Sequence, residues 1–308
     1  MCTFDTLKRL LSQQGIPCRT HVPMAPYTSF RIGGEVALLV EPTDEAQLTE
    51  TLRLVRESSL PSLLLGRASN VLLPDDPMDA VIIRTTELSG TVTVADTTLS
   101  ASAGTSLIEI ARAAQRAGLG GFEFAYGIPG SFGGALCMNA GAYGGEMSDV
   151  VRSVRVYDAD RDEIVSLDGE RMQFSYRHSL LLSSPHLIVL GATLALRQDD
   201  PQAIEARMRD YMSRRRDKQP LEYPSAGSVF KRPVGAFAGA LIEQSGLKGY
   251  RIGGAEVSIK HAGFIINVGG ATANDVLALI QHIKDTVKRD HGVELETEIQ
   301  FPTALWAR

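Results

Sequence analysis

The sequence predicts an α+β protein of three successive units, covering residues 1–85, 86–199 and 200–308. In the first unit, strand-like and helix-like segments alternate, which is typical of a small α/β unit. Between residues 91 and 196 the chain is rich in strand-like segments, of which TVTVAD and TLSASAG alternate apolar and polar side chains with period two. The last unit is dominated by helical patterns. A chain of 308 residues is also long for a single hydrophobic core.

The first unit opens with an amphipathic helical pattern over the first fifteen residues. The apolar run VALLV (36–40) predicts a buried strand. Thr43 or Asp44 can cap a helix over 44–57, because either side chain can accept a hydrogen bond from the first turn. Two further apolar runs predict strands at 63–65 and 81–83.

The second and third units are assigned in the same way. A hairpin is expected at 91–103, followed by a helix over 106–117 that ends at Gly118, a residue suited to the left-handed conformation after a helix. Strands are expected in VVRSVRVYD, EIVSL and LIVLGATLAL, and near 255–268. Helices are expected over 201–218, 236–245 and 272–290. The helix over 201–218 is basic; it is either a solvated surface or a guide for an anionic substrate.

The composition excludes several classes of protein. With 44% hydrophobic and 22% charged residues and a net charge of −5, the chain is typical of a soluble globular protein and not of a nucleic-acid binder. No apolar run is long enough for a transmembrane helix, and no signal peptide is visible, so we expect a cytoplasmic protein. Three cysteines in no C-x-x-C pattern and six dispersed histidines predict neither disulfides nor a metal site.

One segment is unusually rich in glycine: GIPGSFGGALCMNAGAYGG (127–145) has seven glycines in nineteen residues. Backbone without side chains can approach a bulky anionic ligand closely, and its N–H groups can hold a pyrophosphate. The alternative is a glycine-rich surface loop. A second polar turn, LGRASNVLL (65–73), follows a predicted strand, and we expect the two segments to close on one phosphate-containing ligand. Neither G-x-G-x-x-G nor a P-loop is present, so this is not a dinucleotide or P-loop turn.

Taken together, seven blocks resemble the UDP-N-acetylenolpyruvoylglucosamine reductases of bacterial peptidoglycan synthesis, also called UDP-N-acetylmuramate dehydrogenases. The resemblance runs from about residue 20 to 300, in order and spacing. The blocks are YTSFRIGG (27–34), LGRASNVLL (65–73), GIPGSFGGALCMNAGAYGGE (127–146), YRHS (176–179), PSAGSVFKRP (224–233), GLKGYRIGGAEVSIKHAGFIINVGGAT (246–272) and VELETEI (293–299). Only a short stretch separates Ser179 from the next predicted strand, which resembles the compact subclass of the family.

The resemblance implies a two-part FAD-binding domain of the vanillyl-alcohol-oxidase (PCMH) type, followed by an α+β substrate-binding domain. It implies non-covalent FAD and NADPH as hydride donor, with no metal. The residues expected to bind the cofactor are Gly66, Ser69, Asn70, Gly127, Pro129, Gly130, Ser131, Gly133, Gly134, Asn139, Gly141, Ala142 and Tyr143.

The implied reaction reduces the enolpyruvyl ether of UDP-N-acetylglucosamine enolpyruvate to the lactyl ether of UDP-N-acetylmuramate. By resemblance, Arg177 grips the substrate carboxylate, Glu298 is its second partner, and Ser228 gives a proton to the α-carbon. Lys231 either stabilises the resulting alkoxide or binds the diphosphate. Lys260 and His261 are also expected to bind the substrate.

Each assignment has a structural alternative: a surface ion pair for Arg177, a strand-edge carboxylate for Glu298, and a helix cap for Ser228. Glu294, Glu296 and Ser225 could also be the true motif residues. Two residues depart from the usual pattern. Ala68 replaces a glycine of the 66–70 turn, at a cost of about 1 kcal/mol if that position has positive φ, and His178 replaces an acidic residue.

Two other functions are weighed against the reductase. One is a flavin oxidase of the same fold acting on another substrate. The other is a catalytically inactive nucleotide-sugar-binding protein. We expect a monomer that takes a small-molecule substrate and binds neither nucleic acid nor membrane.

Overall fold

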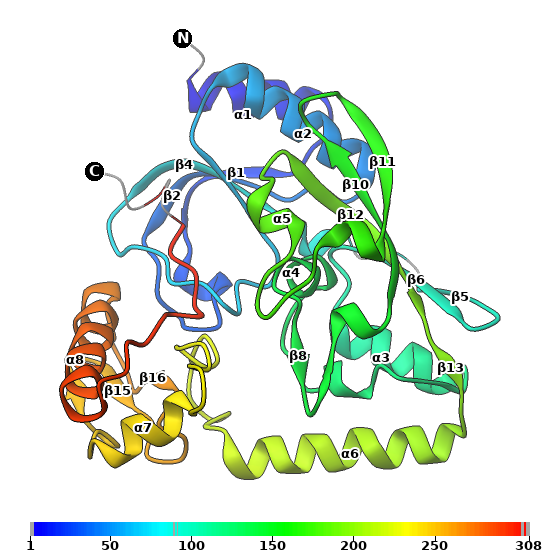
Figure 1. Ribbon diagram of the computed structural model, residues 1–308. Helices are drawn as coiled ribbons and strands as arrows, with labels where there is room; N and C mark the ends of the chain where they lie inside the picture. The colour runs from blue at the N-terminus through cyan, green and yellow to red at the C-terminus, as the bar shows by residue number, and fades with distance from the viewer. Residues whose placement is uncertain (1–2, 89, 91, 303–304, 306–308) are drawn as a thin grey trace. The chain divides into compact units, whose positions relative to one another are not determined.

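The computed structural model describes residues 3–88, 90, 92–302 and 305, and its helices and strands confirm the predicted α+β class (Figure 1). The helices are α1 (Phe4–Gln13), α2 (Glu45–Ser58), α3 (Leu107–Arg116), α4 (Phe132–Cys137), α5 (Leu180–Ser183), α6 (Pro201–Lys218), α7 (Ala238–Gln244) and α8 (Ala273–His291). The strands are β1 (Cys18–Pro23), β2 (Glu35–Val40), β3 (Ser62–Leu65), β4 (Met78–Arg84), β5 (Thr93–Ala95), β6 (Thr98–Ser102), β7 (Leu119–Gly120), β8 (Gly141–Ala142), β9 (Gly145–Glu146), β10 (Val151–Asp158), β11 (Glu163–Asp168), β12 (Leu187–Ala195), β13 (Arg197–Gln198), β14 (Arg251–Ile252), β15 (Ala255–Val257) and β16 (Ile265–Asn267).

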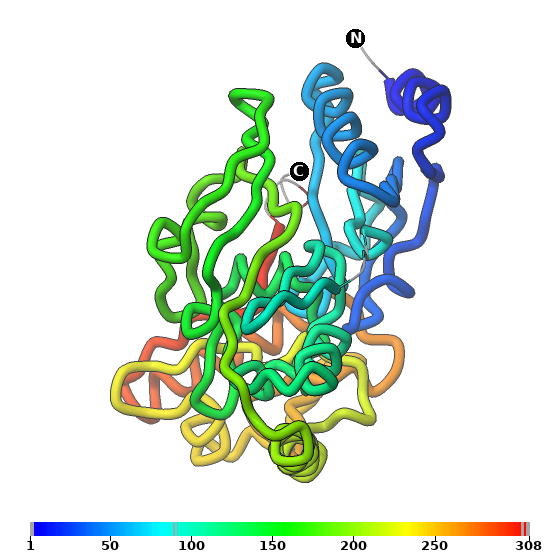
Figure 2. Tube along the Cα trace, turned by 90° about the vertical axis from the view of Figure 1, so that its right-hand side faces the viewer, coloured from blue at the N-terminus to red at the C-terminus, as the bar shows by residue number. Residues whose placement is uncertain are grey.

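Three sheets of three or more strands carry the fold. Their strand orders are β1-β2-β4-β3, β11-β10-β12-β6-β5 and β14-β15-β16. In the five-stranded sheet every neighbouring pair is antiparallel, and its hairpin β10–β11 is drawn in green in Figure 2. The β5–β6 pairing confirms the hairpin that the alternating pattern predicts, although Thr91, where that pattern starts, lies outside the described residues.

Side-chain caps decide where several helices begin, as the sequence suggests. Asp44 begins α2 by accepting the amide of Gln47 at 2.8 Å. Helix α8 begins with a capping box, in which Thr272 and Asp275 each accept the other's backbone amide. Helix α3 stops just before Gly118, whose φ of +67° is the left-handed conformation expected there. Helices α1 and α2 lie side by side (Figures 1 and 2).

The chain divides into two compact units. The first consists of Met1–Arg19, Leu39–Arg67 and Ile82–Arg215; the second of Thr20–Leu38, Ala68–Val81 and Arg216–Arg308. The core of the first unit lies between α3, α4 and the five-stranded sheet, and that of the second between α7, α8 and the β15–β16 strands. The predicted division into 1–85, 86–199 and 200–308 remains a prediction. Among the described residues, no helix combines the length and apolar character needed to cross a membrane.

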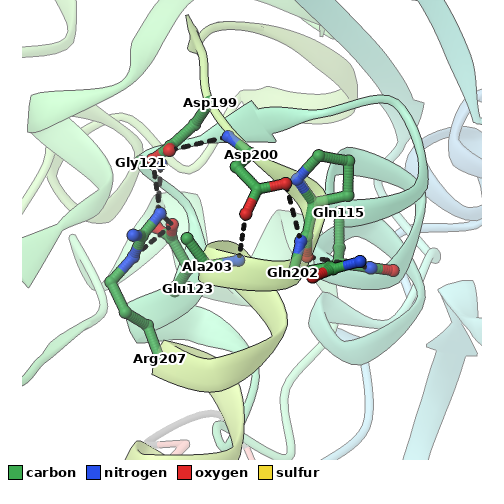
Figure 3. A network of polar contacts seen from close by, with 9 residues as sticks. Gln115, Gly121, Glu123, Asp199, Asp200, Gln202, Ala203 and Arg207 are labelled. Carbon is green, nitrogen blue, oxygen red and sulfur yellow. Dashed lines mark hydrogen bonds and ion pairs between the residues drawn. The ribbon is translucent and has the colours of Figure 1, made fainter.

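The beginning of α6 is anchored to the first unit by a buried carboxylate (Figure 3). Glu123 is only 7% exposed, and it accepts hydrogen bonds from Arg207 Nε and Nη2 at 3.0 and 2.6 Å and from the Gly121 amide at 2.8 Å. Arg207 also pairs with Asp199. The hydrogen bond to Glu123 is the largest cause of a raised pKa for Arg207. The basic helix is therefore partly fixed by internal ion pairs.

Candidate active site

The polar turn after β3 and the glycine-rich segment touch each other within the first unit. A Cβ atom on Gly66 would lie 2.0 Å from Ser131 Oγ, so only glycine fits at this position. Ser131 is 2% exposed, and its hydroxyl accepts the amide of Gly134 at 3.4 Å as the cap of α4. The structure thus brings together two segments that the sequence assigned to one ligand.

The glycine-rich segment, for which the sequence predicted no helix, contains one: six of its residues form α4. The loop prediction was wrong here because tertiary packing compensates for the low helix propensity of glycine. Phe132 and Leu136 are fully buried in the core of the first unit. Gly133 packs so closely on Ala103 that a Cβ there would approach the Ala103 methyl to 3.1 Å. Pro129 and Gly130 precede the helix in irregular backbone.

After α4 the segment forms the short hairpin β8–β9, with Tyr143 and Gly144 at its tip. Both have positive φ, +55° and +87°, as a type I′ turn requires. The Tyr143 ring stacks on Tyr211 of α6 with centroids 4.5 Å apart, and its hydroxyl donates to the Tyr211 carbonyl oxygen at 2.9 Å. Gly141 cannot be replaced, because a Cβ would lie 2.7 Å from the Gly145 carbonyl oxygen. Ala142 follows it in β8.

Two features near this segment fit an anionic cofactor. Arg215 lies against Gly127, where an added Cβ would be 3.1 Å from its Cδ. Burial lowers the pKa of Arg215, and among the described residues none provides a carboxylate within ion-pair distance of it. The hydroxyl of Thr105 is fully buried without a hydrogen-bond partner in the described part of the chain, while its carbonyl accepts the Phe132 amide at 2.8 Å. A polar, negatively charged ligand would satisfy both groups.

Arg177 stands at the tip of a two-residue turn. Ser175 and His178 exchange both of their backbone hydrogen bonds, at 3.0 and 3.1 Å, and leave Tyr176 and Arg177 between them. Arg177 has a φ of +55°, a conformation that favours glycine, and such strain is often found at functional positions. Its guanidinium lies 5.0 Å from the Tyr176 ring centroid. His178, the departure from the family pattern, hydrogen-bonds Ser183 of α5 at 3.0 Å.

Both ends of this turn are held at the C-terminal end of α4, by its last residue and by Asn139 just after it. Asn139 is fully buried; its side-chain NH₂ donates to the Ser175 carbonyl at 3.1 Å, and its side-chain oxygen accepts the Ser148 amide at 2.9 Å. Ser179 is also fully buried, and its hydroxyl donates to the Cys137 carbonyl at 2.8 Å. The sequence singled out Asn139 as a cofactor ligand and gave no role to Ser179, although Ser179 closes the YRHS motif.

In the second unit, three segments distant in sequence meet at Glu298. The Glu298 amide donates to the Val229 carbonyl at 2.7 Å, and the Asn70 side-chain NH₂ donates to the Glu298 carbonyl at 3.2 Å. Ser228 precedes Val229 and forms an isolated antiparallel bridge with Phe264. The structure therefore brings Asn70, Ser228 and Glu298 together, and all three are half-buried. Arg177 belongs to the first unit.

The neighbouring glutamates are engaged at the surface. Glu294 pairs with Lys288 of α8 at 2.6 Å, and Glu296 pairs with Lys231; their side chains are 77% and 73% exposed. Glu298 is the glutamate of this run that lies at the junction with Ser228. The ammonium of Lys231 is occupied by Glu296, and its two predicted roles both stay predictions.

Lys260 and His261 lie together in the turn before β16. Lys260 is exposed, with its ammonium 3.7 Å from the Glu222 carboxylate. His261 accepts the Gly263 amide through Nδ1 at 3.1 Å, and its ring meets the edge of Phe264 with centroids 5.0 Å apart. Burial lowers the pKa of His261 below its usual 6.5, so the ring is neutral at pH 7.

The 66–70 turn needs positive φ at Ala68, where φ is +47°. The replacement of glycine by alanine therefore carries a conformational cost of about 1–2 kcal/mol. The Ala68 carbonyl accepts the Ser29 amide at 3.2 Å, and the Ser29 hydroxyl donates to the Ser225 carbonyl at 2.7 Å. Ser225 thus hydrogen-bonds through its backbone to Ser29, next to the turn. Ser228 instead precedes Val229, the residue that pairs with Glu298. Ser69 is half-buried in the same turn.

The remaining reactive groups lie elsewhere. Burial raises the pKa of Cys137 to about 11, so its thiol is protonated at neutral pH, in agreement with a packing role. Cys18 is also a free thiol, and Cys2 lies outside the described residues. Asp158, Asp160 and His186 are close enough together to hold a metal ion.

Comparison with known proteins identifies the family. The family model described as "UDP-N-acetylenolpyruvoylglucosamine reductase, C-terminal domain" matches residues 219–302, and one described as "FAD binding domain" matches 36–168. The UDP-N-acetylenolpyruvoylglucosamine reductase of Clostridium perfringens is 47% identical over 279 residues, which cover 91% of each chain. The chain belongs to the UDP-N-acetylenolpyruvoylglucosamine reductase family.

Other members of the reductase family agree over nearly the whole length. The relative from Clostridioides difficile is 45% identical over 97% of each chain. The crystal structure of the reductase from Thermus caldophilus is 34% identical and superposes with a TM-score of 0.77 over 93% of this chain and 98% of that one. These matches confirm the predicted family and its fold: an FAD-binding domain followed by the C-terminal domain of the reductases.

Proposed function

We propose that this chain catalyses the NADPH-driven, FAD-dependent reduction of UDP-N-acetylglucosamine enolpyruvate to UDP-N-acetylmuramate in peptidoglycan precursor synthesis. The activity and oxidoreductase class follow from membership of the reductase family. The structural observation that carries the proposal is the junction of Asn70, Ser228 and Glu298, since it unites three separate family motifs. We further propose that the protein is a cytoplasmic monomer.

The first unit provides the groups that suit FAD, held without a covalent bond. Glycines at 66, 127, 130, 133, 134 and 141 keep the backbone accessible, and Arg215 and Thr105 offer a charge and a hydroxyl. Pro129, Ser131, Ala142 and Tyr143 complete the set that we propose for this unit, and Ser69 and Asn70 of the second unit are proposed with them. When bound, the flavin supplies the hydride chemistry, and the protein has to orient the substrate and manage charge.

The protein's own residues deal with the charge that develops on the substrate. Reduction at the β-carbon places negative charge on the α-carbon and its carboxylate. Arg177 binds this carboxylate through two parallel N–H groups, and Glu298 shares a proton with it as its charge rises. Ser228 then gives its hydroxyl proton to the basic α-carbon. Lys231, Lys260 and His261 are proposed to bind the rest of the substrate.

The absorption spectrum of the purified protein tests this proposal. We expect the bands of oxidised flavin, bleached by NADPH and restored by UDP-N-acetylglucosamine enolpyruvate; NADH in place of NADPH should bleach them more slowly. A protein that takes up no added FAD would contradict the proposal and favour a nucleotide-sugar-binding protein. A flavin reoxidised by oxygen but not by the enolpyruvate would favour an oxidase of the same fold.

A further inference from the structure

The contacts around Arg177 assign a role to two buried residues that do not themselves face the proposed substrate. Arg177 can grip a carboxylate only if its turn is held in place, because bidentate binding depends on a fixed direction of the guanidinium. Tyr176 and Arg177 are joined to the rest of the turn by the two backbone hydrogen bonds between Ser175 and His178. These bonds close the turn but do not fix it to any other element.

Two side chains make the connection to the glycine-rich segment. The Asn139 side-chain NH₂ donates to the Ser175 carbonyl at 3.1 Å, on one side of Arg177. The Ser179 hydroxyl donates to the Cys137 carbonyl at 2.8 Å, on the other side. Asn139 and Ser179 are both fully buried, so water does not compete for these hydrogen bonds.

Asn139 is also well suited to its backbone position. Its φ is +42°, a left-handed conformation that asparagine tolerates better than most other side chains. Its side-chain oxygen accepts the Ser148 amide at 2.9 Å, which fixes the orientation of the amide group and turns its NH₂ toward Ser175. In this structure both the nitrogen and the oxygen of the amide hydrogen-bond within the protein.

We propose that Asn139 and Ser179 are positioning residues, which fix the 175–178 turn, and with it Arg177, to the C-terminal end of α4. The N-terminal end of the same helix is capped by Ser131, which touches Gly66 of the other cofactor turn. One six-residue helix therefore sets the spacing between the proposed cofactor segment and the proposed carboxylate-binding arginine. The inference rests on the role proposed for Arg177.

A double-mutant cycle on the FAD-loaded enzyme tests this inference. Asn139→Gly keeps the left-handed backbone accessible and removes the amide, and Ser179→Ala removes the second tether. We expect each to slow reoxidation of the reduced flavin by the enolpyruvate, about tenfold or more for Asn139→Gly, while flavin reduction by NADPH changes little. Arg177→Lys should slow the same step. Combined with Arg177→Lys, each tether mutation should add almost nothing, because its effect passes through the arginine.

The outcomes separate this inference from the proposed function. If Arg177→Lys slows reoxidation and Asn139→Gly multiplies that loss in full, the positioning role is overturned and the catalytic role of Arg177 stands. Equal losses in flavin reduction and reoxidation would also overturn it, because they indicate a general role in the cofactor segment. If Arg177→Lys has no effect, the role proposed for Arg177 fails and the inference fails with it. Should Asn139→Gly not retain FAD, Ser179→Ala decides the question by the same cycle.

Discussion

The backbone amide of Glu298 lies 2.7 Å from the carbonyl oxygen of Val229, and this hydrogen bond pairs Glu298 with the residue that follows Ser228. The chain offers three glutamates at alternate positions here, and the motif alone does not say which one acts. The pairing between residues 228–231 and 296–298 favours Glu298, because it leaves Glu296 to Lys231 at the surface and keeps Glu298 half-buried at the junction.

Replacement of Glu298 by glutamine should lower turnover while leaving the KM for the enolpyruvate nearly unchanged. The carboxyl group is expected to act on charge that develops only during the reaction, and loss of such a group typically costs about 10²–10³ in kcat. Steady-state kinetics measure this directly. Glu296→Gln is the matched control and should keep near wild-type turnover, since it removes only a surface ion pair. Equal activity of both variants would exclude Glu298 from the reaction.

Ser228→Ala should leave reduction of the flavin by NADPH intact and slow the enolpyruvate half-reaction by about 10²–10⁴, the usual value of a positioned proton donor. Stopped-flow absorbance separates the two half-reactions. Ser225→Ala is the control, because the known contacts of Ser225 are made by its backbone and survive the change. Similar losses in both half-reactions of Ser228→Ala would show a binding or folding role instead.

Arg207→Ala should destabilise the protein by about 2 kcal/mol, because it leaves the Glu123 carboxylate buried without its cation. This expected loss of stability is smaller than the ~3–5 kcal/mol lost when a fully buried ion pair is broken, because the Arg207 side chain is itself about a third exposed. Chemical denaturation of the holoenzyme measures the loss. Arg209→Ala on the same helix removes an exposed pair with Glu205 and should cost no more than about 0.5 kcal/mol. Equal losses would mean that the burial of Glu123 contributes nothing.

Acidification should destabilise the protein through His261 at pH values below 6.5. Burial lowers the pKa of His261 in the folded state, so the unfolded chain takes up the proton first and becomes favoured as the pH falls. His261→Asn should reduce this pH dependence, because its side-chain oxygen can still accept the Gly263 amide and does not titrate. Denaturation midpoints at pH 7.5 and 5.5 test it. An unchanged difference between the two pH values would place the titrating group elsewhere.

The elements that the sequence predicted well are those whose ends carry their own chemical signals. Asp44 begins α2 and Gly118 follows α3 as expected, because capping and left-handed termination are local interactions. The helix α4 was missed because Gly133 and Gly134 lower the local helix propensity, and the cap residue Ser131 alone did not outweigh them. It is stabilised by the burial of Phe132 and by the fit of Gly133 against Ala103, which only the tertiary structure provides.

The site was predictable as a set of motifs but not as a set of contacts. The resemblance supplied Arg177, Ser228 and Glu298, yet it gave no means of choosing among neighbouring glutamates or serines. It also assigned Asn139 to the cofactor, which stays a prediction. A sequence does not reveal that this amide is fully buried and hydrogen-bonded through both its nitrogen and its oxygen. Such assignments depend on pairings between residues far apart in the chain, for which local patterns carry no information.

The meeting of Asn70 and Glu298 has a consequence for synthesis on the ribosome. Residues of the 66–70 turn leave the ribosome early, but their partners in the second unit follow only after more than two hundred further residues have been added. At about 5–20 residues per second, this interval lasts on the order of 10–50 seconds. Throughout it, the N-terminal part of the nascent chain lacks the backbone carbonyl that accepts the Asn70 side chain. A chain that is cut short before residue 298 therefore cannot form this junction.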